Sequence, residues 1–371
     1  MKLLIISSAP LIVSEKKWKA YSPYAKELEI WRHNPKEIMF CCPIWTDDRG
    51  LLSTALPFNI DEVTKLNEFE STSFYNALKS IFAVIVNLLK IFKAMKTADH
   101  IHLRCPGNVG LLGCIVQLFF PNKKKSAKYA GNWDPNAKQP LSYKLQRWIL
   151  SNTFLTKNMT VLVYGEWPHQ TKNVKPFFTA SYSENDKKPV ALRDFNGIVD
   201  LIFVGTLSAG KRPLYVLQLA EKVLKKGHNV RLKFFGEGPE RAKLQDYIQS
   251  NNLTGSVFLL GNKDKEEIKS AYQTSHFLIL PSQSEGWPKV VAEAMFWGCL
   301  PIATPISCVA NMIGTDRGGL LKLNLDKDCE LIENLMDDLD VYNQKSENAM
   351  NWSRFYTLEK FDAEIKKLLV K

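Results

Sequence analysis

The chain has no C-x-x-C pair, and its seven cysteines are an odd number spread along 371 residues. Small secreted domains instead carry even numbers of regularly spaced cysteines that pair as disulfides. We therefore expect reduced, mostly buried thiols, as in a cytosolic protein.

Long apolar runs are also missing. Residues 1–10 hold one lysine and a short apolar run, too short for the apolar core and cleavage site of a signal peptide. Residues 81–92 and 111–120 are interrupted by polar side chains and fall short of the roughly 20 apolar residues that span a bilayer. We expect no transmembrane segment, and a location in the cytoplasm that extends at most to the inner face of the membrane.

Signatures of redox cofactors and metals are absent too. No G-x-G-x-x-G follows the first expected strand, where the chain has Ser-Ser-Ala-Pro at residues 7–10, which argues against a dinucleotide-binding fold. The six histidines show no ligand spacing, so we expect structural roles for them. Two Asp-x-Asp matches, residues 326–328 and 338–340, lie in acidic helical surroundings and are interpreted as solvated surface. We therefore predict neither a metal nor a cofactor.

What is present is an alternation of apolar strands and amphipathic helices in both halves of the chain. It predicts an α/β protein with two doubly wound, Rossmann-like domains that face one another across a cleft. The expected domains are residues 1–185 and 198–350, with a polar linker at 186–197 and a final helix at 351–371. Strands are expected at residues 38–42, 101–104, 127–130, 160–164, 199–204, 230–235, 257–260, 277–280 and 300–303.

The net charge of +11 is unevenly placed. Residues 1–197 hold 27 Lys and Arg against 16 Asp and Glu, whereas residues 198–371 hold 22 of each. The first half should therefore meet an anionic partner: a phosphorylated acceptor, an anionic membrane surface or nucleic acid. Nucleic acid is the least favoured, because the basic residues form no known reader module.

A long helix is expected at residues 74–95. Its apolar content is unusually high for a surface helix, although it carries Lys79, Lys90 and Lys93. Such a helix is either well buried or lies against an apolar partner such as a membrane, and both interpretations stay open.

The loop at residues 131–135 follows an expected parallel strand, which is where α/β proteins place ligands. Asn132 and Asp134 are therefore candidates for the acceptor side of the cleft. The loop has no histidine, so no catalytic histidine is assigned.

The stretch LILPSQSEGWPKVVAEAMFWGCLPI, residues 278–302, organises the second half. A buried strand should end at Leu280, and a helix should begin with Pro288 at its first position and end at Gly298. Glu285 lies before this helix and Glu293 lies within it.

This arrangement suits a phosphorylated polyol. The N–H groups of Lys289 and Val290 would lie at the positive end of the helix dipole, where a phosphate is stabilised. Glu285 and Glu293 can accept hydrogen bonds from hydroxyls on either side of that phosphate, as in a nucleotide sugar. A surface helix with two solvated glutamates is the alternative, and spacing alone does not decide between them.

Residues 285–294, EGWPKVVAEA, resemble the E-x7-E signature of retaining glycosyltransferases of the GT-B fold, family 4 in particular. The resemblance implies that Glu285 contacts the donor sugar and Glu293 holds the ribose hydroxyls. The amides between them, from Gly286 and Trp287 onward, would receive the diphosphate. Many members have glycine where this chain has Pro288, so phosphate contact should shift to Lys289 and Val290.

Two further turns resemble elements of the same family. After the strand at 199–204, Gly205 and Lys211 resemble the G-R-x-x-x-x-K element that binds the donor diphosphate, although Thr206 replaces the arginine. Either Arg212 compensates for the missing arginine or one charge contact to the diphosphate is absent. The Gly236 turn resembles the family's G-x-G-P turn.

The segment around Asn262 would lie beside the nucleotide base in such a protein. In the GT-B fold the last helix crosses back to the first domain, and the resemblance implies the same for residues 351–371.

The activity implied is retaining transfer of a sugar from a nucleoside diphosphate sugar to a hydroxyl of a glycan or lipid-linked acceptor, as in surface polysaccharide biosynthesis. UDP-sugars are favoured by their frequency in the family, with GDP-sugars second. Lys211 and the helix N-terminus would stabilise the charge of the leaving group. A nucleotide-sugar epimerase or a non-catalytic nucleotide-sugar-binding subunit of the same fold is the alternative.

Overall fold

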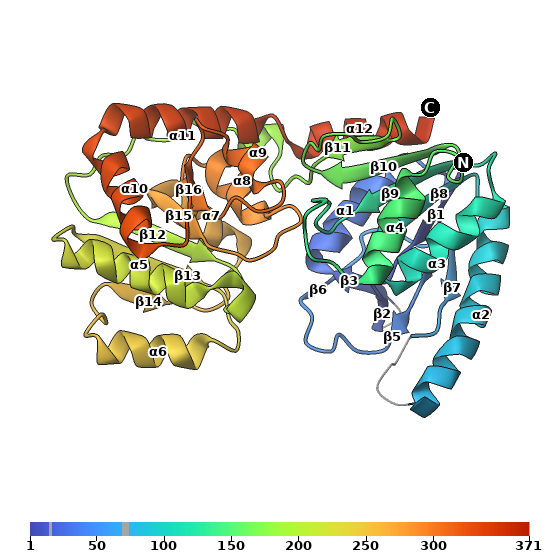
Figure 1. Ribbon diagram of the computed structural model, residues 1–371. Helices are drawn as coiled ribbons and strands as arrows, with labels where there is room; N and C mark the ends of the chain where they lie inside the picture. The colour runs from blue at the N-terminus through green and yellow to red at the C-terminus, as the bar shows by residue number, and fades with distance from the viewer. Residues whose placement is uncertain (15–16, 69–73, 371) are drawn as a thin grey trace. The chain divides into compact units, whose positions relative to one another are not determined.

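A computed structural model of the chain describes residues 1–14, 17–68 and 74–370. The chain forms two units, which we call unit 1 (Met1–Phe177 with Asp362–Lys371) and unit 2 (Phe178–Phe361). Each unit is a parallel sheet with helices packed on it (Figure 1), so the predicted α/β class is confirmed.

Seven parallel strands form the main sheet of unit 1, in the order β11-β10-β9-β8-β1-β4-β7. The order reverses beside β1, as in doubly wound sheets. All four residues from Leu3 to Ile6 are buried, because β1 has a neighbour on each side and helices on its faces. The strands are β1 (Lys2–Ile6), β4 (Glu37–Cys42), β7 (Glu62–Lys65), β8 (His100–Cys105), β9 (Lys124–Tyr129), β10 (Met159–Tyr164) and β11 (Val174–Phe177).

Unit 1 also contains a small mixed sheet, with strands in the order β5-β2-β3-β6, which the sequence did not predict. Its strands have two to five residues, too few to show a clear alternation. They are β2 (Leu11–Ser14), β3 (Lys17–Tyr21), β5 (Ile44–Trp45) and β6 (Ser53–Ala55).

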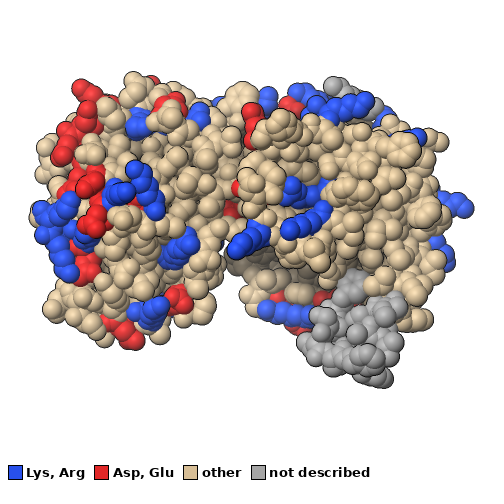
Figure 2. Space-filling view, viewed as in Figure 1, with Lys and Arg blue, Asp and Glu red and all other residues tan. Residues whose placement is uncertain are grey.

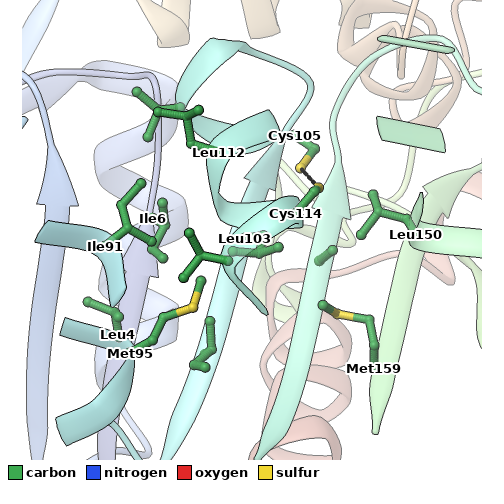
Figure 3. Packing of buried hydrophobic residues seen from close by; sticks show 14 of the residues in the cluster. Leu4, Ile6, Ile91, Met95, Leu103, Cys105, Leu112, Cys114, Leu150 and Met159 are labelled. Atoms are coloured by element: carbon green, nitrogen blue, oxygen red, sulfur yellow. Dashed lines mark hydrogen bonds between the residues drawn. The ribbon is translucent and has the colours of Figure 1, made fainter. Parts of the chain in front are cut away.

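The helices of unit 1 are α1 (Ser22–Arg32), α2 (Phe74–Thr97), α3 (Asn108–Val116), the 3-10 turn η1 (Gln117–Phe119), α4 (Leu141–Ser151) and α12 (Leu358–Val370), which begins in unit 2. Figure 3 shows Ile91 and Met95 of α2 packed toward Leu4 and Leu103 of the strands. Among the described helices, none has both the length and the apolar character needed to cross a membrane.

Unit 2 has six parallel strands in the order β14-β13-β12-β15-β16-β17. The strands are β12 (Val199–Val204), β13 (Val230–Phe235), β14 (Val257–Leu259), β15 (Phe277–Leu280), β16 (Leu300–Ala303) and β17 (Gly319–Leu320). The helices are the 3-10 turns η2 (Glu184–Asp186) and η3 (Ala209–Lys211), and α5 (Pro213–Lys225), α6 (Arg241–Ser250), α7 (Lys265–Thr274), α8 (Lys289–Phe296), α9 (Val309–Ile313), α10 (Leu325–Asp337) and α11 (Leu339–Arg354).

Residues 186–197, predicted as a linker, lie within unit 2 instead. The Arg193 guanidinium donates hydrogen bonds to the carbonyl oxygens of Tyr272 and Trp297, at 2.9 and 3.0 Å. The Phe195 ring lies parallel to the Phe277 ring with centroids 6.1 Å apart. Two anchors in an otherwise polar segment thus fix it to the sheet of unit 2.

The last predicted helix, residues 351–371, is divided between α11 and α12. Thr357 lies in the break and is fully buried. Its hydroxyl donates to the Glu184 carboxylate at 2.8 Å and accepts the Lys360 N–H at 3.3 Å. A threonine in this position starts a new helix, because its oxygen satisfies an N–H of the first turn. Asp362–Lys371 then belong to unit 1.

The interpretation of both Asp-x-Asp matches as solvated surface is wrong for Asp328, which is 1% exposed. Its carboxylate accepts hydrogen bonds from the Lys322 N–H at 2.8 Å and from the Tyr215 hydroxyl. Asp338 instead caps α11, accepting the Val341 N–H at 3.0 Å. Both aspartates therefore serve the fold.

Candidate functional site

The loops after β12, β13 and β15 leave the sheet of unit 2 at the same edge, because its strands are parallel. Backbone hydrogen bonds join these loops to one another. The Leu207 N–H donates to the Glu237 carbonyl and the Gln283 N–H to the Gly210 carbonyl, at 2.9 and 2.8 Å. These hydrogen bonds join the segments nominated by the sequence into one continuous loop surface. It lies at the edge of the sheet where α/β proteins bind ligands.

Glycines allow these loops to approach closely. Gly205 and Gly236 have φ of 151° and 141°, and a Cβ on Gly236 would lie 2.0 Å from the Gly205 carbonyl oxygen. Gly236 also pairs with Gly261 as an isolated bridge. Thr206 and Asn262, beside these glycines, are exposed at the loop surface.

Lys211 and Glu285, the two residues predicted as catalytic, form an ion pair between Nζ and Oε1. The Glu285 side chain is only 10% exposed, whereas that of Lys211 is 29% exposed. An anionic ligand can therefore reach the lysine. The Arg212 guanidinium, next along the chain, donates to the Pro281 carbonyl at 3.1 Å and so fixes the loop that carries Glu285.

Helix α8 begins at Lys289, one residue later than predicted, and Pro288 is its N-cap with φ of −74° and ψ of 91°. Hydrogen bonding within the helix starts with the Val291 N–H, which donates to the Pro288 carbonyl at 3.0 Å. Gly298, with φ of 71°, follows the last turn as predicted. The first-turn amides, Lys289 and Val290 among them, lie at the positive end of the helix dipole.

Glu293 is held by residues that the sequence did not nominate. The Ser181 hydroxyl donates to one carboxylate oxygen at 2.5 Å, and the Tyr272 hydroxyl lies 3.5 Å from the other. Burial and, to a lesser extent, the negative charge of Glu293 raise the pKa of Tyr272 well above its usual range. The phenol therefore stays protonated and can donate a hydrogen bond. No local pattern points to Ser181, because it is 112 residues away in the sequence.

A pocket of unit 2 is lined by Trp287, Lys289 and Glu293, together with Ser181 and Tyr356 among others. The Trp287 and Tyr356 rings contact each other with centroids 5.9 Å apart. Three of the predicted donor residues thus share one pocket, and its wall also includes residues 179–182, further residues of α8, Ser353 of α11 and Tyr356.

The backbone of Gly286 is fixed from outside the motif. Its carbonyl oxygen accepts hydrogen bonds from the Cys308 thiol at 3.0 Å and the Ser307 hydroxyl at 3.4 Å. Ser307 has φ of 48°, a strained value for a side chain with a Cβ. These two residues position the loop, and nothing in the sequence pattern marked them.

In unit 1, Asn132 and Asp134 shape their own loop. The Asn132 side-chain oxygen accepts the Asp134 N–H at 2.9 Å, and the Asp134 carboxylate accepts the Asn136 N–H at 2.8 Å. Both are local turns that such residues form readily. Their assignment to an acceptor stays a prediction.

The carboxyl ends of β8 and β9 carry a polar cluster that the sequence did not suggest. Arg104 and Lys128 both contact the Glu27 carboxylate, at 3.4 and 2.9 Å. Burial lowers the pKa of Lys128, although the charge of Glu27 opposes this. The Glu27 carboxylate thus pairs with both cations at the carboxyl edge of the parallel sheet, where α/β proteins bind ligands.

The histidines that the structure buries have structural roles. His100 and His102 both bond to the Ser126 hydroxyl, at 2.9 Å each. Burial lowers the pKa of His100 to about 4 and that of His102 well below its usual range, so both rings are neutral at pH 7. Within residues 1–14, 17–68 and 74–370, no three His, Cys, Asp or Glu side chains gather where they could hold a metal ion.

Comparison with protein families matches residues 185–352 to the model described as glycosyl transferases group 1. A Haemophilus influenzae protein named as an uncharacterized glycosyltransferase is 29% identical over 174 residues, which are 46% of this chain and 48% of that protein. The poly(glycerol-phosphate) alpha-glucosyltransferase of Bacillus subtilis is 24% identical over 184 residues, which are 49% and 27%. This chain therefore spans less than half the length of either relative.

Two solved structures resemble the whole chain. HepE of Anabaena, in complex with UDP and glucose, aligns over 100% of this chain and 98% of its own, with a TM-score of 0.67 and 12% identity. Sucrose-phosphate synthase of Thermosynechococcus elongatus aligns over 99% and 98%, with a TM-score of 0.63 and 16% identity. At such identity the likeness shows the fold, which is GT-B, as predicted.

Proposed function

Because residues 185–352 belong to the glycosyl transferases group 1 family, we propose that the chain is a retaining glycosyltransferase that moves a sugar from a nucleoside diphosphate sugar to a hydroxyl. The observation that carries the proposal is the Lys211–Glu285 ion pair at the ligand-binding edge of unit 2. In the chain, Glu285 of that pair comes shortly before Trp287, which lines the same pocket as Glu293.

The residues divide the donor between them. A diphosphate would be a second anionic partner for Lys211, which would leave the Glu285 carboxylate to accept hydrogen bonds from the sugar hydroxyls. The first-turn amides of α8 would face the same phosphates. As the bond to the sugar breaks, negative charge grows on the diphosphate, and fixed positive groups lower the barrier by stabilising it. We propose that these groups act without a cofactor.

UDP is our preferred nucleotide and GDP the second choice. HepE is described in complex with UDP and glucose, and TarM of Staphylococcus aureus in complex with UDP. We propose that Asn262, which is exposed beside the Gly236–Gly261 bridge, contacts the base.

The acceptor is proposed to be a glycan or a lipid-linked glycan of surface polysaccharide biosynthesis, handled in the cytoplasm at the inner face of the membrane. The name of the Bacillus subtilis relative, an enzyme that glucosylates poly(glycerol phosphate), supports a phosphate-rich acceptor. So does the charge of the chain, whose excess of Lys and Arg lies within residues 1–197. Asn132 and Asp134 are the acceptor-side candidates.

The test measures donor binding and turnover separately. A thermal-shift screen of UDP-, GDP- and ADP-sugars identifies the donor, since a ligand bound only by the native state raises the melting temperature. Glu285→Ala and Glu293→Ala should then each lose at least about a hundredfold in turnover. Glu347→Ala, an exposed glutamate of α11, is the matched control and should be unchanged.

Other results point to the alternatives. An epimerase would convert the sugar while it stays attached to the nucleotide. A binding subunit would show the thermal shift with no product. Unchanged transfer by both glutamate variants would remove the site assignment.

A further inference from the structure

Helix α2 carries an apolar stripe on its outer face. The side chains of Phe82, Ile85 and Leu89 are 70%, 52% and 60% exposed, and that of Phe92 is 40% exposed. Spacings of three, four and three residues place all four on one side of the helix. At 1.5 Å per residue the stripe is about 15 Å long.

The stripe continues onto the next element. Phe119 of η1 is 70% exposed, and its ring lies edge-on to that of Phe92 with centroids 6.2 Å apart. We call Phe82, Ile85, Leu89, Phe92 and Phe119 the α2 patch.

The α2 patch contributes little to the core of unit 1. The opposite side of α2 provides the buried contacts, with Ile91 and Met95 fully buried and Ala94 at 5% exposure (Figure 3). A single exposed apolar side chain needs no explanation, but a contiguous group marks a surface that meets a partner.

Positive charge surrounds the patch. Residues 71–98 contain no Asp or Glu, and from residue 71 to residue 133 the only acidic residue is Asp99. Lys93 and Lys96 are exposed and lie on the same side of α2 as the stripe, at its C-terminal end. Lys124, also exposed, follows η1. In Figure 2, Lys and Arg predominate over Asp and Glu on the visible face of unit 1, whereas both signs mix on unit 2.

We propose that the α2 patch docks unit 1 on an anionic lipid surface. Aromatic and aliphatic side chains would enter the boundary between headgroups and acyl chains, and the lysines would lie at the level of the anionic headgroups. Helices that bind a membrane surface combine these features, an apolar face and lysines beside it.

Charge favours lipid over a second copy of the chain. In a two-fold contact each copy presents the same surface to the other. Lys93 and Lys96 of both copies would then enter one interface to which α2 brings no carboxylate. A membrane rich in anionic lipid supplies the opposite charge.

Binding to vesicles tests the proposal without any nucleotide sugar, so its outcome is independent of the transferase activity. The full chain should co-sediment at low salt with vesicles of phosphatidylglycerol and phosphatidylcholine, and much less with phosphatidylcholine alone. Phe82→Ser with Leu89→Ser, and separately Lys93→Glu with Lys96→Glu, should each weaken the partition at least about tenfold.

Matched controls come from unit 2. Leu339 and Val341 are 39% and 42% exposed, so L339S/V341S repeats the apolar change elsewhere. K322E/K327E repeats the charge change on two other exposed lysines. Both controls should bind vesicles as the unaltered chain does, and all variants should keep its melting temperature, because they alter exposed positions.

A labelled cysteine shows which face is in contact. All seven native cysteines are buried, so Leu89→Cys should take up an environment-sensitive dye selectively. The dye should shift to shorter wavelength with the anionic vesicles, and a dye on Leu339→Cys should not. Equal binding to neutral vesicles, unimpaired binding by both patch variants, or a dimer that the same variants dissociate would overturn the proposal.

Discussion

Replacing Arg193 with alanine should lower the melting temperature of unit 2 and weaken the binding of the nucleotide sugar together. The guanidinium donates to the carbonyl oxygens of Tyr272, Gln273 and Trp297 at 2.9 to 3.0 Å, and also to that of Gly298. It anchors the segment that begins at residue 178 and carries Ser181, the partner of Glu293.

The magnitude follows from the acceptors left behind. A buried polar group that loses its partner costs about 1–3 kcal/mol. Two of the acceptors belong to Tyr272 and Trp297, which are fully buried, so a loss of about 3 kcal/mol is expected. For a domain of roughly 150–250 residues, each kcal/mol shifts the melting temperature by about 2–4 °C, which gives a decrease of about 6–12 °C.

Calorimetry with and without the nucleotide sugar measures both effects. Arg193→Lys keeps the charge and can reach only part of the acceptor set. Its melting temperature should therefore lie between those of the unaltered chain and R193A. Lys188→Ala, an exposed position of the same segment, serves as the control. A decrease below about 2 °C for R193A would show that residues 186–197 behave as a linker and that Arg193 does not anchor them to unit 2.

Three further outcomes are expected. Gly236→Ala should destabilise unit 2 by at least about 2 kcal/mol in urea denaturation, since the added Cβ would clash with the Gly205 carbonyl. Gly255→Ala is the control and should change the stability little, because there is open space around Gly255. Ser181→Ala should raise the KM for the donor about fivefold in steady-state kinetics, because it removes the hydroxyl that orients Glu293, and an unchanged KM would count against this role. Because the pKa values of His100 and His102 are lowered in the folded chain, the unfolded chain binds protons first as the pH falls. The contribution of these two histidines to the free energy of unfolding should therefore be constant above about pH 6.5. It should decrease toward pH 4 by ~1.4 kcal/mol per pH unit for each histidine. His100→Asn should flatten that slope in urea titrations across the same range.

Most of the strands that the sequence predicted have neighbours on both sides, although β14, which it also predicted, is an edge strand of unit 2. Residues 199–204, 230–235 and 277–280 coincide with β12, β13 and β15. β15 is a continuous apolar run buried on both faces, whereas β13, with the sequence VRLKFF, alternates apolar and charged residues. The strands it missed in the main sheet of unit 1 are the two at its edges. β7 is polar, with the sequence EVTK, and β11 contains Pro176, which only an edge strand tolerates. These two edge strands are partly exposed, so they lack the apolar run.

The site shows the same division between local and distant information. Lys211, Glu285 and Glu293 lie in short segments whose residue types and spacing led to the proposed donor site. Their partners come from elsewhere in the chain, since Ser181 meets Glu293 across 112 residues. Contacts of this range depend on how the chain closes, which no local spacing reports.

The two departures from the family pattern now have different consequences. Pro288 is the N-cap of α8, so its missing N–H lies before the first helical turn and removes none of the amides at the helix N-terminus. Thr206 leaves a real gap in charge, because Arg212 is engaged with the Pro281 carbonyl. Arg212 thus contributes by fixing the Glu285 loop, and we propose that Lys211 is the residue of that turn that meets the diphosphate. The proposed donor site should therefore depend more steeply on Lys211 than on Arg212, and K211A should lose more affinity for the nucleotide sugar than R212A.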